Sequence, residues 1–156
     1  MTGLWPAAGT GTDVGLLAAQ AALAAEHATV YGYGVVGAWA GPEVRPQVRG
    51  LMEAHRGQRD ELRQAVRELG GAPVAASAGY SLPFPVGDVA SARDLAAELE
   101  VRLAGAYADL VRASDGAARL AAARALRRSA LRSAWWRGSG QALPGLAEHS
   151  INGARR

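Results

Sequence analysis

The apolar stretch from residue 13 to residue 40 constrains the fold of this chain more than any other feature. It contains no Lys or Arg, yet Glu26 and His27 lie near its middle. On a helix, residues three or four positions apart share one face, so Glu26 falls in the same stripe as Leu23 and Tyr33. A carboxylate on a core-facing stripe is costly unless it is paired, hydrogen-bonded, protonated or bound to metal. The rest of the sequence must therefore supply its partners.

The composition favours a single all-helical domain without disulfide bonds. A chain of 156 residues suits one domain. Its hydrophobic content of 49% is dominated by small and aliphatic residues, which argues against disorder and lets helices approach closely. No cysteine is present, so neither a disulfide framework nor a thiolate metal site is expected.

The charge pattern argues against membranes and nucleic acids as partners. All 17 basic residues are Arg, and the formal net charge is only +3 because acidic residues are interspersed. The first basic residue is Arg45, so no cationic segment precedes the apolar stretch as a signal peptide requires. A central Glu-His pair also makes that stretch a poor membrane span. We therefore expect a soluble, cytoplasmic protein.

A second helix is expected from about residue 43 to residue 69. Val48 and Leu62 recur at helical spacing, and His55 lies inside the same apolar stripe. The glycine pair Gly70-Gly71 should end this helix with a left-handed cap, because glycine adopts the left-handed backbone conformation without steric cost.

Residues 70–87 then form an unusually long connection for a helical bundle. Helices of about 26 residues span roughly 39 Å at 1.5 Å per residue. A connection of about 18 residues can extend to about 60 Å, so it can run the full length of the bundle. Since neighbouring antiparallel helices need only a short turn, this length predicts a crossover between the second and third helices. Tyr80, Leu82 and Phe84 are expected to pin it to the bundle.

The third helix is expected to begin at Asp88 or Ser91, with Ser91 and Asp94 forming a capping box. A row of leucines gives its apolar face. Glu98 and Glu100 flank that face on opposite sides, and periodicity alone does not decide which of them points inward.

The fourth helix is expected over residues 117–137. Arg124 and Arg127 fall on or beside its apolar stripe, and the pair Trp135-Trp136 is expected to supply one core anchor and one interface residue. The residues of this predicted stripe are Leu120, Ala123, Leu131, Ala134 and Trp135.

Four-helix bundles with one long crossover often hold two metal ions. Two helices each contribute a Glu, and the other two each contribute a Glu-x-x-His motif. The chain resembles this ferritin-like superfamily: Glu26 and Tyr33 look like its first-helix Glu and Tyr, and Leu99-Glu100 looks like its third helix, which selects Glu100 over Glu98. More narrowly, the chain resembles a bacterial ferritin-like domain family of unknown function over about residues 16–146. The segments that carry this resemblance are Glu26-His27, Tyr31-Gly32-Tyr33, His55-Arg56, Arg59-Asp60, Gly79-Tyr80-Ser81-Leu82-Pro83, Leu99-Glu100 and Leu143-Pro144-Gly145.

The sequence departs from the di-iron pattern at several ligand positions. Met52, and not a bridging Glu, stands three residues before His55, and Glu53 lies about 100° further around the helix. Residues 117–137 contain no Glu, Asp or His. The resemblance therefore leaves at most three metal ligands: Glu26, His55 and Glu100.

Two main interpretations of these residues stay open. In the first, the metal site is degenerate and an arginine of the fourth helix, Arg127 by preference and Arg124 next, neutralises Glu26 within the protein. In the second, the three ligands hold one Fe, Mn or Zn ion. Acid/base chemistry by Glu26 and His55 without a metal is a further possibility. The core polar network expected in the first case comprises Glu26, Tyr33, His55, Glu100 and Arg127.

The resulting prediction is an all-α, ferritin-like four-helix bundle over residues 13–146, with a lead-in over 1–12 and a frayed tail over 147–156. The predicted function is a non-catalytic interaction or small-ligand scaffold without a cofactor. The alternative is a mono-metal-binding protein or oxidoreductase. A homodimer through an Ala- and Gly-rich helix face is expected, together with a protein partner of unknown identity. His27 and Tyr31 are expected to serve helix packing or an oligomer contact.

Overall fold

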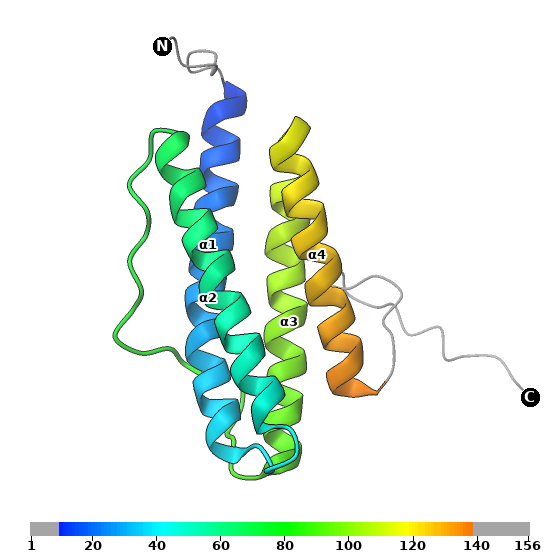
Figure 1. The fold of residues 1–156 in the computed structure, drawn as a ribbon. Helices are drawn as coiled ribbons and strands as arrows, with labels where there is room; N and C mark the ends of the chain where they lie inside the picture. Colours follow the sequence, from blue (N-terminus) through cyan, green and yellow to red (C-terminus); the bar gives the residue numbers. More distant parts are fainter. Residues whose placement is uncertain (1–9, 139–156) are drawn as a thin grey trace, which may run out of the picture.

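The computed structural model describes residues 10–138, most of which lie in four helices. Short turns join the first helix to the second and the third to the fourth, whereas residues 69–88 run the length of the bundle (Figure 1). No strand occurs within residues 10–138. The predicted all-α four-helix bundle with a long crossover is confirmed. Its helices are α1 (Thr10–Trp39), α2 (Arg45–Glu68), α3 (Val89–Arg112) and α4 (Gly116–Arg137).

The predicted lead-in falls mostly, and the predicted tail wholly, outside the described residues, as does the predicted domain end at residue 146. Helix α1 begins at Thr10, three residues before the apolar stretch that starts at residue 13. Gly11 is tolerated in its first turn because one glycine costs only about 1 kcal/mol relative to alanine. Within the described part of the chain, no helix is long and apolar enough to cross a membrane.

The ends of α2 and α3 follow from capping residues. Gly70 adopts the left-handed conformation with φ of 83°, which confirms the predicted end of α2. Helix α3 is capped by Asp88, whose side chain accepts a hydrogen bond from the backbone N–H of Ser91 at 2.7 Å. Hydrogen bonds from the side chain and backbone of Ser91 lower the pKa of Asp88. The predicted capping box of Ser91 with Asp94 is therefore wrong, because the helix starts earlier and Ser91 occupies the third position of the box.

Side chains of α1 hold the crossover against that helix. Gln20 binds it twice, donating to the carbonyl of Ala72 at 2.6 Å and accepting from the N–H of Val74 at 2.9 Å. His27 Nε2 donates to the carbonyl of Val74 at 3.0 Å. The ring of Tyr31 packs on that of Tyr80, with centroids 5.4 Å apart. His27 and Tyr31 thus serve packing of the crossover on α1.

The apolar core is divided into two clusters. The first surrounds Tyr33 and Trp136, and the crossover residues Leu82 and Phe84 pack against it, as predicted. The second surrounds Leu103 and extends toward the other end of the bundle. Buried polar side chains lie between the two clusters, as the next section describes.

Glycine allows α1 to approach α3 closely at one point. A Cβ added at Gly32 would collide with the side chain of Leu99 on α3. Gly34, two residues further along α1, faces open space with nothing within 4 Å. A side chain at position 32 would therefore force Leu99 to move, whereas one at position 34 would not displace any neighbour.

Helix α4 presents a different face to the core from the one predicted. The predicted stripe is wrong, because Leu120, Leu131 and Trp135 are 52%, 56% and 50% exposed. The close backbone approach of α4 is to α3, and small side chains on the buried face let these two helices pack closely. The size of the side chains at this contact, and not their hydrophobicity, thus sets which side of α4 faces the core. Its buried residues are Ala122, Ala125, Ser129, Ser133 and Trp136.

Candidate functional site

A histidine lies between two carboxylates at the centre of the bundle. The Nδ1 atom of His55 on α2 is 2.9 Å from an oxygen of Glu26 on α1. Its Nε2 atom is 3.0 Å from an oxygen of Glu100 on α3. All three side chains are 0% exposed. Three helices thus meet at one imidazole ring.

Two tyrosines connect the carboxylates in a reciprocal arrangement. Tyr33 lies seven residues after Glu26 on α1 and donates to Glu100 on α3 at 2.7 Å. Tyr107 lies seven residues after Glu100 on α3 and donates to Glu26 on α1 at 2.6 Å. Because a spacing of seven residues is close to two helical turns, each tyrosine stays on the face of its own helix that carries the glutamate. One hydrogen bond thus runs from α1 to α3 and a second one from α3 to α1.

Each tyrosine oxygen also accepts a hydrogen bond. The indole N–H of Trp136 on α4 donates to Tyr33 at 3.0 Å. The amide of Gln58 on α2 donates to Tyr107 at 3.1 Å and to Glu26 at 2.9 Å. The donors and acceptors of both hydroxyls are therefore used, and all four helices contribute to the network.

An arginine of α4 reaches the edge of this network. Arg132 Nη1 donates to the amide oxygen of Gln58 at 3.3 Å and lies 3.4 Å from Nε2 of His55. No carboxylate lies within 4.0 Å of its guanidinium among residues 10–138. Arg132 therefore contributes positive charge from one side, without forming a direct ion pair with Glu26 or Glu100.

The hydrogen bonds of His55 favour its protonated form. Burial alone lowers the pKa of His55, but the hydrogen bonds to Glu100 and Glu26 and their negative charges outweigh burial and raise the pKa above its usual value. Only an imidazolium can donate from both ring nitrogens at once. Burial is also the main cause of the raised pKa of Tyr33 and of Tyr107, and the neighbouring carboxylate adds to it. Both hydroxyls therefore remain protonated donors.

The buried cluster combines acidic and basic groups. Two carboxyl groups contact one imidazole, and one guanidinium lies at its edge. Such a cluster adds little net stability relative to an apolar core, but removing one member leaves an uncompensated buried charge and costs about 3–5 kcal/mol. The arrangement therefore behaves as a structural unit whose members depend on one another.

The structure brings together most of the residues predicted for the core network. Glu26, Tyr33, His55 and Glu100 are in hydrogen-bond contact, and Glu98 is on the surface, where it pairs with Arg102 at 2.7 Å. Arg127 and Arg124 do not take part, because both side chains are exposed. The predicted role of Arg127 is therefore wrong. Arg132, five residues later and about 140° around the helix, is the arginine that reaches the network.

Four members of the network were missed from the sequence: Gln58, Tyr107, Arg132 and Trp136, whose indole N–H donates to Tyr33. Gln58 lies three residues after His55 on the same stripe, and its neutral amide gave no electrostatic signal. Tyr107 repeats after Glu100 the spacing that Tyr33 has after Glu26, so the duplicated spacing could have revealed it. Arg132 was missed because α4 was assigned the wrong inward face.

These residues do not fit the two-metal centre that the resemblance implies. Met52 supplies no bridging carboxylate, and α4 offers Ser129 and Arg132 at the positions where the spacing of the pattern would put its second Glu and His. Both ring nitrogens of His55 already contact carboxylates, so neither presents a lone pair to a metal. Over residues 10–138, no group of three or more His, Cys, Asp or Glu side chains has a geometry that could hold a metal ion.

Three buried polar atoms near the middle of the bundle have no hydrogen-bond partner within the described residues. They are Oε2 of Glu100 and the hydroxyl oxygens of Ser129 and Ser133. Buried polar atoms without a protein partner commonly mark a site for internal water or another small group. The polar layer is therefore complete around Glu26 and incomplete around the outer oxygen of Glu100.

The bundle topology and the carboxylate-histidine layer define a ferritin-like four-helix protein. A solved ferritin-like diiron-carboxylate protein from Bacillus anthracis superposes with a TM-score of 0.60, covering 84% of this chain and 93% of the other. Only 16% of its residues are identical, so this likeness concerns the fold.

Residues 18–148 match the family described as Domain of unknown function (DUF4439), and the chain belongs to that family. A solved conserved hypothetical protein, rv2844, from Mycobacterium tuberculosis is 35% identical. It superposes with a TM-score of 0.80, covering 83% of this chain and 92% of the other. The comparison with curated proteins gave no match.

Proposed function

We propose that this protein is a non-catalytic ferritin-like scaffold for a protein or small-molecule partner, in which a degenerate di-metal site has become a structural polar layer. The observation that carries this proposal is the position of His55, whose two ring nitrogens each contact a carboxylate. In a metal centre, at least one of these nitrogens would instead coordinate the ion.

The closed geometry of the layer supports a structural role. Glu26 and His55 have no exposed surface, so a substrate could reach them only if the helices separated. Glu26 uses both carboxylate oxygens to accept from His55, Gln58 and Tyr107. A general base needs a lone pair that faces its substrate, and Glu26 offers none to the outside.

Metal analysis tests the proposal. The chain is purified from cells supplied with iron, manganese and zinc, and the metal content per chain is measured by elemental analysis. We expect far less than one ion per chain, with no change in Glu100→Gln. One ion per chain that is lost in Glu100→Gln, but retained in the matched surface variant Glu98→Gln, would contradict the scaffold proposal.

That opposite result would support the second candidate, a mono-metal-binding protein or oxidoreductase that uses Glu26, His55 and Glu100. One observation favours this candidate: Oε2 of Glu100 is buried and has no partner within residues 10–138. An ion at that position would satisfy the oxygen, although His55 would first have to give up one hydrogen bond.

The assembly and location of the protein are also part of the proposal. We place the scaffold in the cytoplasm and expect a homodimer through small residues that α2 leaves open to solvent, among them Gly50 and Gly57, which have nothing within 4 Å. Sedimentation equilibrium of the wild type and of Gly57→Arg measures this directly. A monomeric wild-type protein at all accessible concentrations would exclude the dimer.

A further inference from the structure

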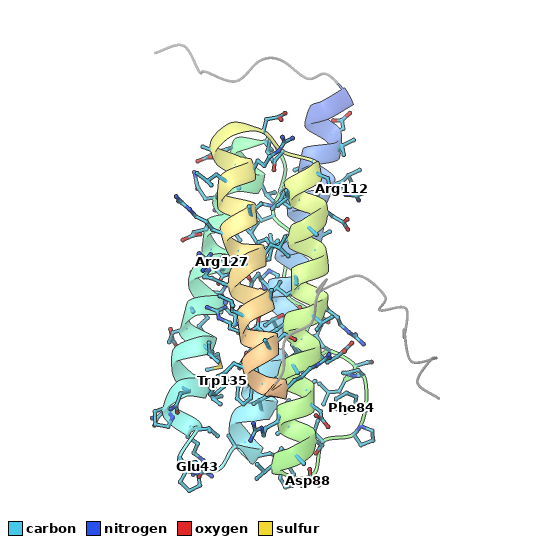
Figure 2. All side chains as sticks on the ribbon, turned by 90° about the vertical axis from the view of Figure 1, so that its right-hand side faces the viewer. Glu43, Phe84, Asp88, Arg112, Arg127 and Trp135 are labelled. Carbon is cyan, nitrogen blue, oxygen red and sulfur yellow. The ribbon has the colours of Figure 1, made fainter. Side chains whose placement is uncertain are left out.

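The side of α4 that points away from α3 combines large apolar residues with arginines. Figure 2 views the bundle from this side, with Arg127 and Trp135 labelled on α4. The crossover runs along the opposite side of the bundle and does not cover it (Figure 1). We call this surface the outer face of α4. It consists of Leu120, Arg124, Arg127, Arg128, Leu131 and Trp135, all of which are exposed.

The arginines of the outer face have no acidic partner in the described part of the chain. Elsewhere on α4, Arg119 pairs with Asp115 at 2.8 Å and Arg137 approaches Glu98 at 4.0 Å. No such pair within 4.0 Å involves Arg124, Arg127 or Arg128 among residues 10–138. Since α4 itself contains no Asp or Glu, these three positive charges have no acidic neighbour on their own helix.

The aromatic residue of this face is held in a fixed orientation. The ring of Trp135 makes an edge-on contact with that of Trp136, with centroids 4.5 Å apart. Trp136 is buried and donates to Tyr33 of the polar layer. Trp135 is therefore half-exposed yet restrained, and a partner would lose little side-chain entropy by packing on it. Trp and Arg are also the residues that contribute most at protein interfaces.

Charge excludes two occupants that belong to this chain. In a symmetric dimer through the outer face, the arginines of one copy would meet those of the other, because the face holds no acidic residue. Residues 139–156 carry one acidic residue, Glu148, so this segment offers a single carboxylate to three guanidinium groups. The complementary partner must bring its own carboxylates.

The arrangement of the residues also disfavours lipid and nucleic acid. At about 100° per residue, Arg124 lies within about 20° of both Leu131 and Trp135 around the helix. Inserting these two apolar side chains into hydrocarbon would draw Arg124 in with them, at the cost of burying a charge. Among the six residues of this face only Trp135 offers a stacking surface for a base, whereas non-specific binding of single strands uses several aromatic side chains on which successive bases stack.

We propose that the outer face of α4 docks an acidic amphipathic segment of another protein, whose apolar residues pack on Leu131 and Trp135 while its carboxylates pair with the arginines. An amphipathic helix laid against an apolar surface is a common mode of peptide recognition, and the charges would set its orientation. This inference rests on the proposed scaffold role and specifies the chemistry of the partner.

The test uses the full chain and a designed probe. The probe is a fluorescent helical peptide with leucines at heptad spacing and glutamates elsewhere, and its control is the same composition in scrambled order. Fluorescence anisotropy should show that the patterned peptide binds at least tenfold more tightly than the scrambled one. Leu131→Ser should weaken binding at least tenfold, and Arg124→Gln combined with Arg128→Gln should do the same. Leu17→Ser on α1, at a residue that is 70% exposed, is the matched control and should change nothing.

Several outcomes would overturn the inference. Equal binding of the scrambled peptide, or equal weakening by Leu17→Ser, would show that the outer face of α4 is not the site. Tighter binding to phosphatidylserine vesicles or to duplex DNA would assign the face to lipid or nucleic acid. A dimer that Leu131→Ser dissociates would assign it to a second copy. If the chain binds no peptide and also holds no stoichiometric metal, the docking inference fails but the scaffold proposal stands.

Discussion

Removing the carboxylate of Glu26 should destabilise the protein far more than removing a surface carboxylate. Glu26 accepts hydrogen bonds from His55 at 2.9 Å, from Gln58 at 2.9 Å and from Tyr107 at 2.6 Å, all inside the core. Glu26→Ala leaves these donors without an acceptor and leaves the imidazolium paired with one carboxylate only. The expected loss is about 3–5 kcal/mol in the free energy of unfolding.

The assay is urea and thermal unfolding followed by far-UV circular dichroism. In a domain of this size, 1 kcal/mol corresponds to about 2–4 °C, so the midpoint should fall by on the order of 10 °C. Glu98→Ala is the matched control: it removes a carboxylate that pairs with Arg102 on the surface, where such pairs contribute at most about 1 kcal/mol. Equal losses in the two variants would refute the view that the buried layer is a mutually dependent unit.

A double substitution sharpens this test. If the imidazolium that Glu26→Leu leaves behind is the source of the penalty, replacing it as well should relieve the penalty. The variant that combines Glu26→Leu with His55→Leu should therefore lose less stability than the sum of the two single variants. Simple additivity would indicate that the two side chains contribute independently.

Three further predictions concern pH, helix approach and the arginine of α4. Because the pKa of His55 is raised on folding, the stability that its protonation contributes is fully present below the unfolded pKa of about 6.5 and is lost as pH rises through the folded pKa. Unfolding experiments across neutral and alkaline pH should show this decline in stability. The variant His55→Gln should no longer show it. Gly32→Ala should destabilise the packing of α1 on α3, whereas Gly34→Ala should raise stability by about 1 kcal/mol, because position 34 is open and alanine favours helix. Thermal melting of both variants measures the difference. A change of the melting temperature in the same direction in both variants would contradict the close approach at Gly32. Arg132→Met should lower the unfolding free energy, while Arg127→Met should leave it unchanged within about 0.5 kcal/mol, since only the first side chain reaches the polar layer.

The sequence determined the four helices and their connections through local chemistry. The glycine that ends α2, for example, adopts the left-handed conformation for which glycine is suited wherever it occurs. The length of the segment over residues 69–88 required a crossover, since a chain of that length is not needed between antiparallel neighbours. The inward direction of Glu26 and His55 also followed from periodicity, because Glu26 shares a helix face with the buried Leu23 and Tyr33, and His55 shares one with the buried Val48 and Leu62.

Helical periodicity left open which of two neighbouring carboxylates enters the core, and it was the family resemblance that pointed to Glu100. The segment Leu95-Ala96-Ala97-Glu98 repeats the order Leu23-Ala24-Ala25-Glu26, so local similarity points to Glu98. The structure places Glu100 inside, because from there it can accept from both Tyr33 and His55, which lie on two other helices. Partners on other helices are not visible in a local pattern.

The rotation of α4 was likewise decided in three dimensions. Leu120, Leu131 and Trp135 repeat at helical spacing and predicted an inward stripe, yet they are exposed while Ala125, Ser129 and Ser133 are buried. A periodic pattern identifies a face of a helix but not the distance at which that face must pack. Where two helices approach closely, small side chains occupy the contact even when larger apolar ones are available, and steric fit between the two helices outweighs hydrophobicity.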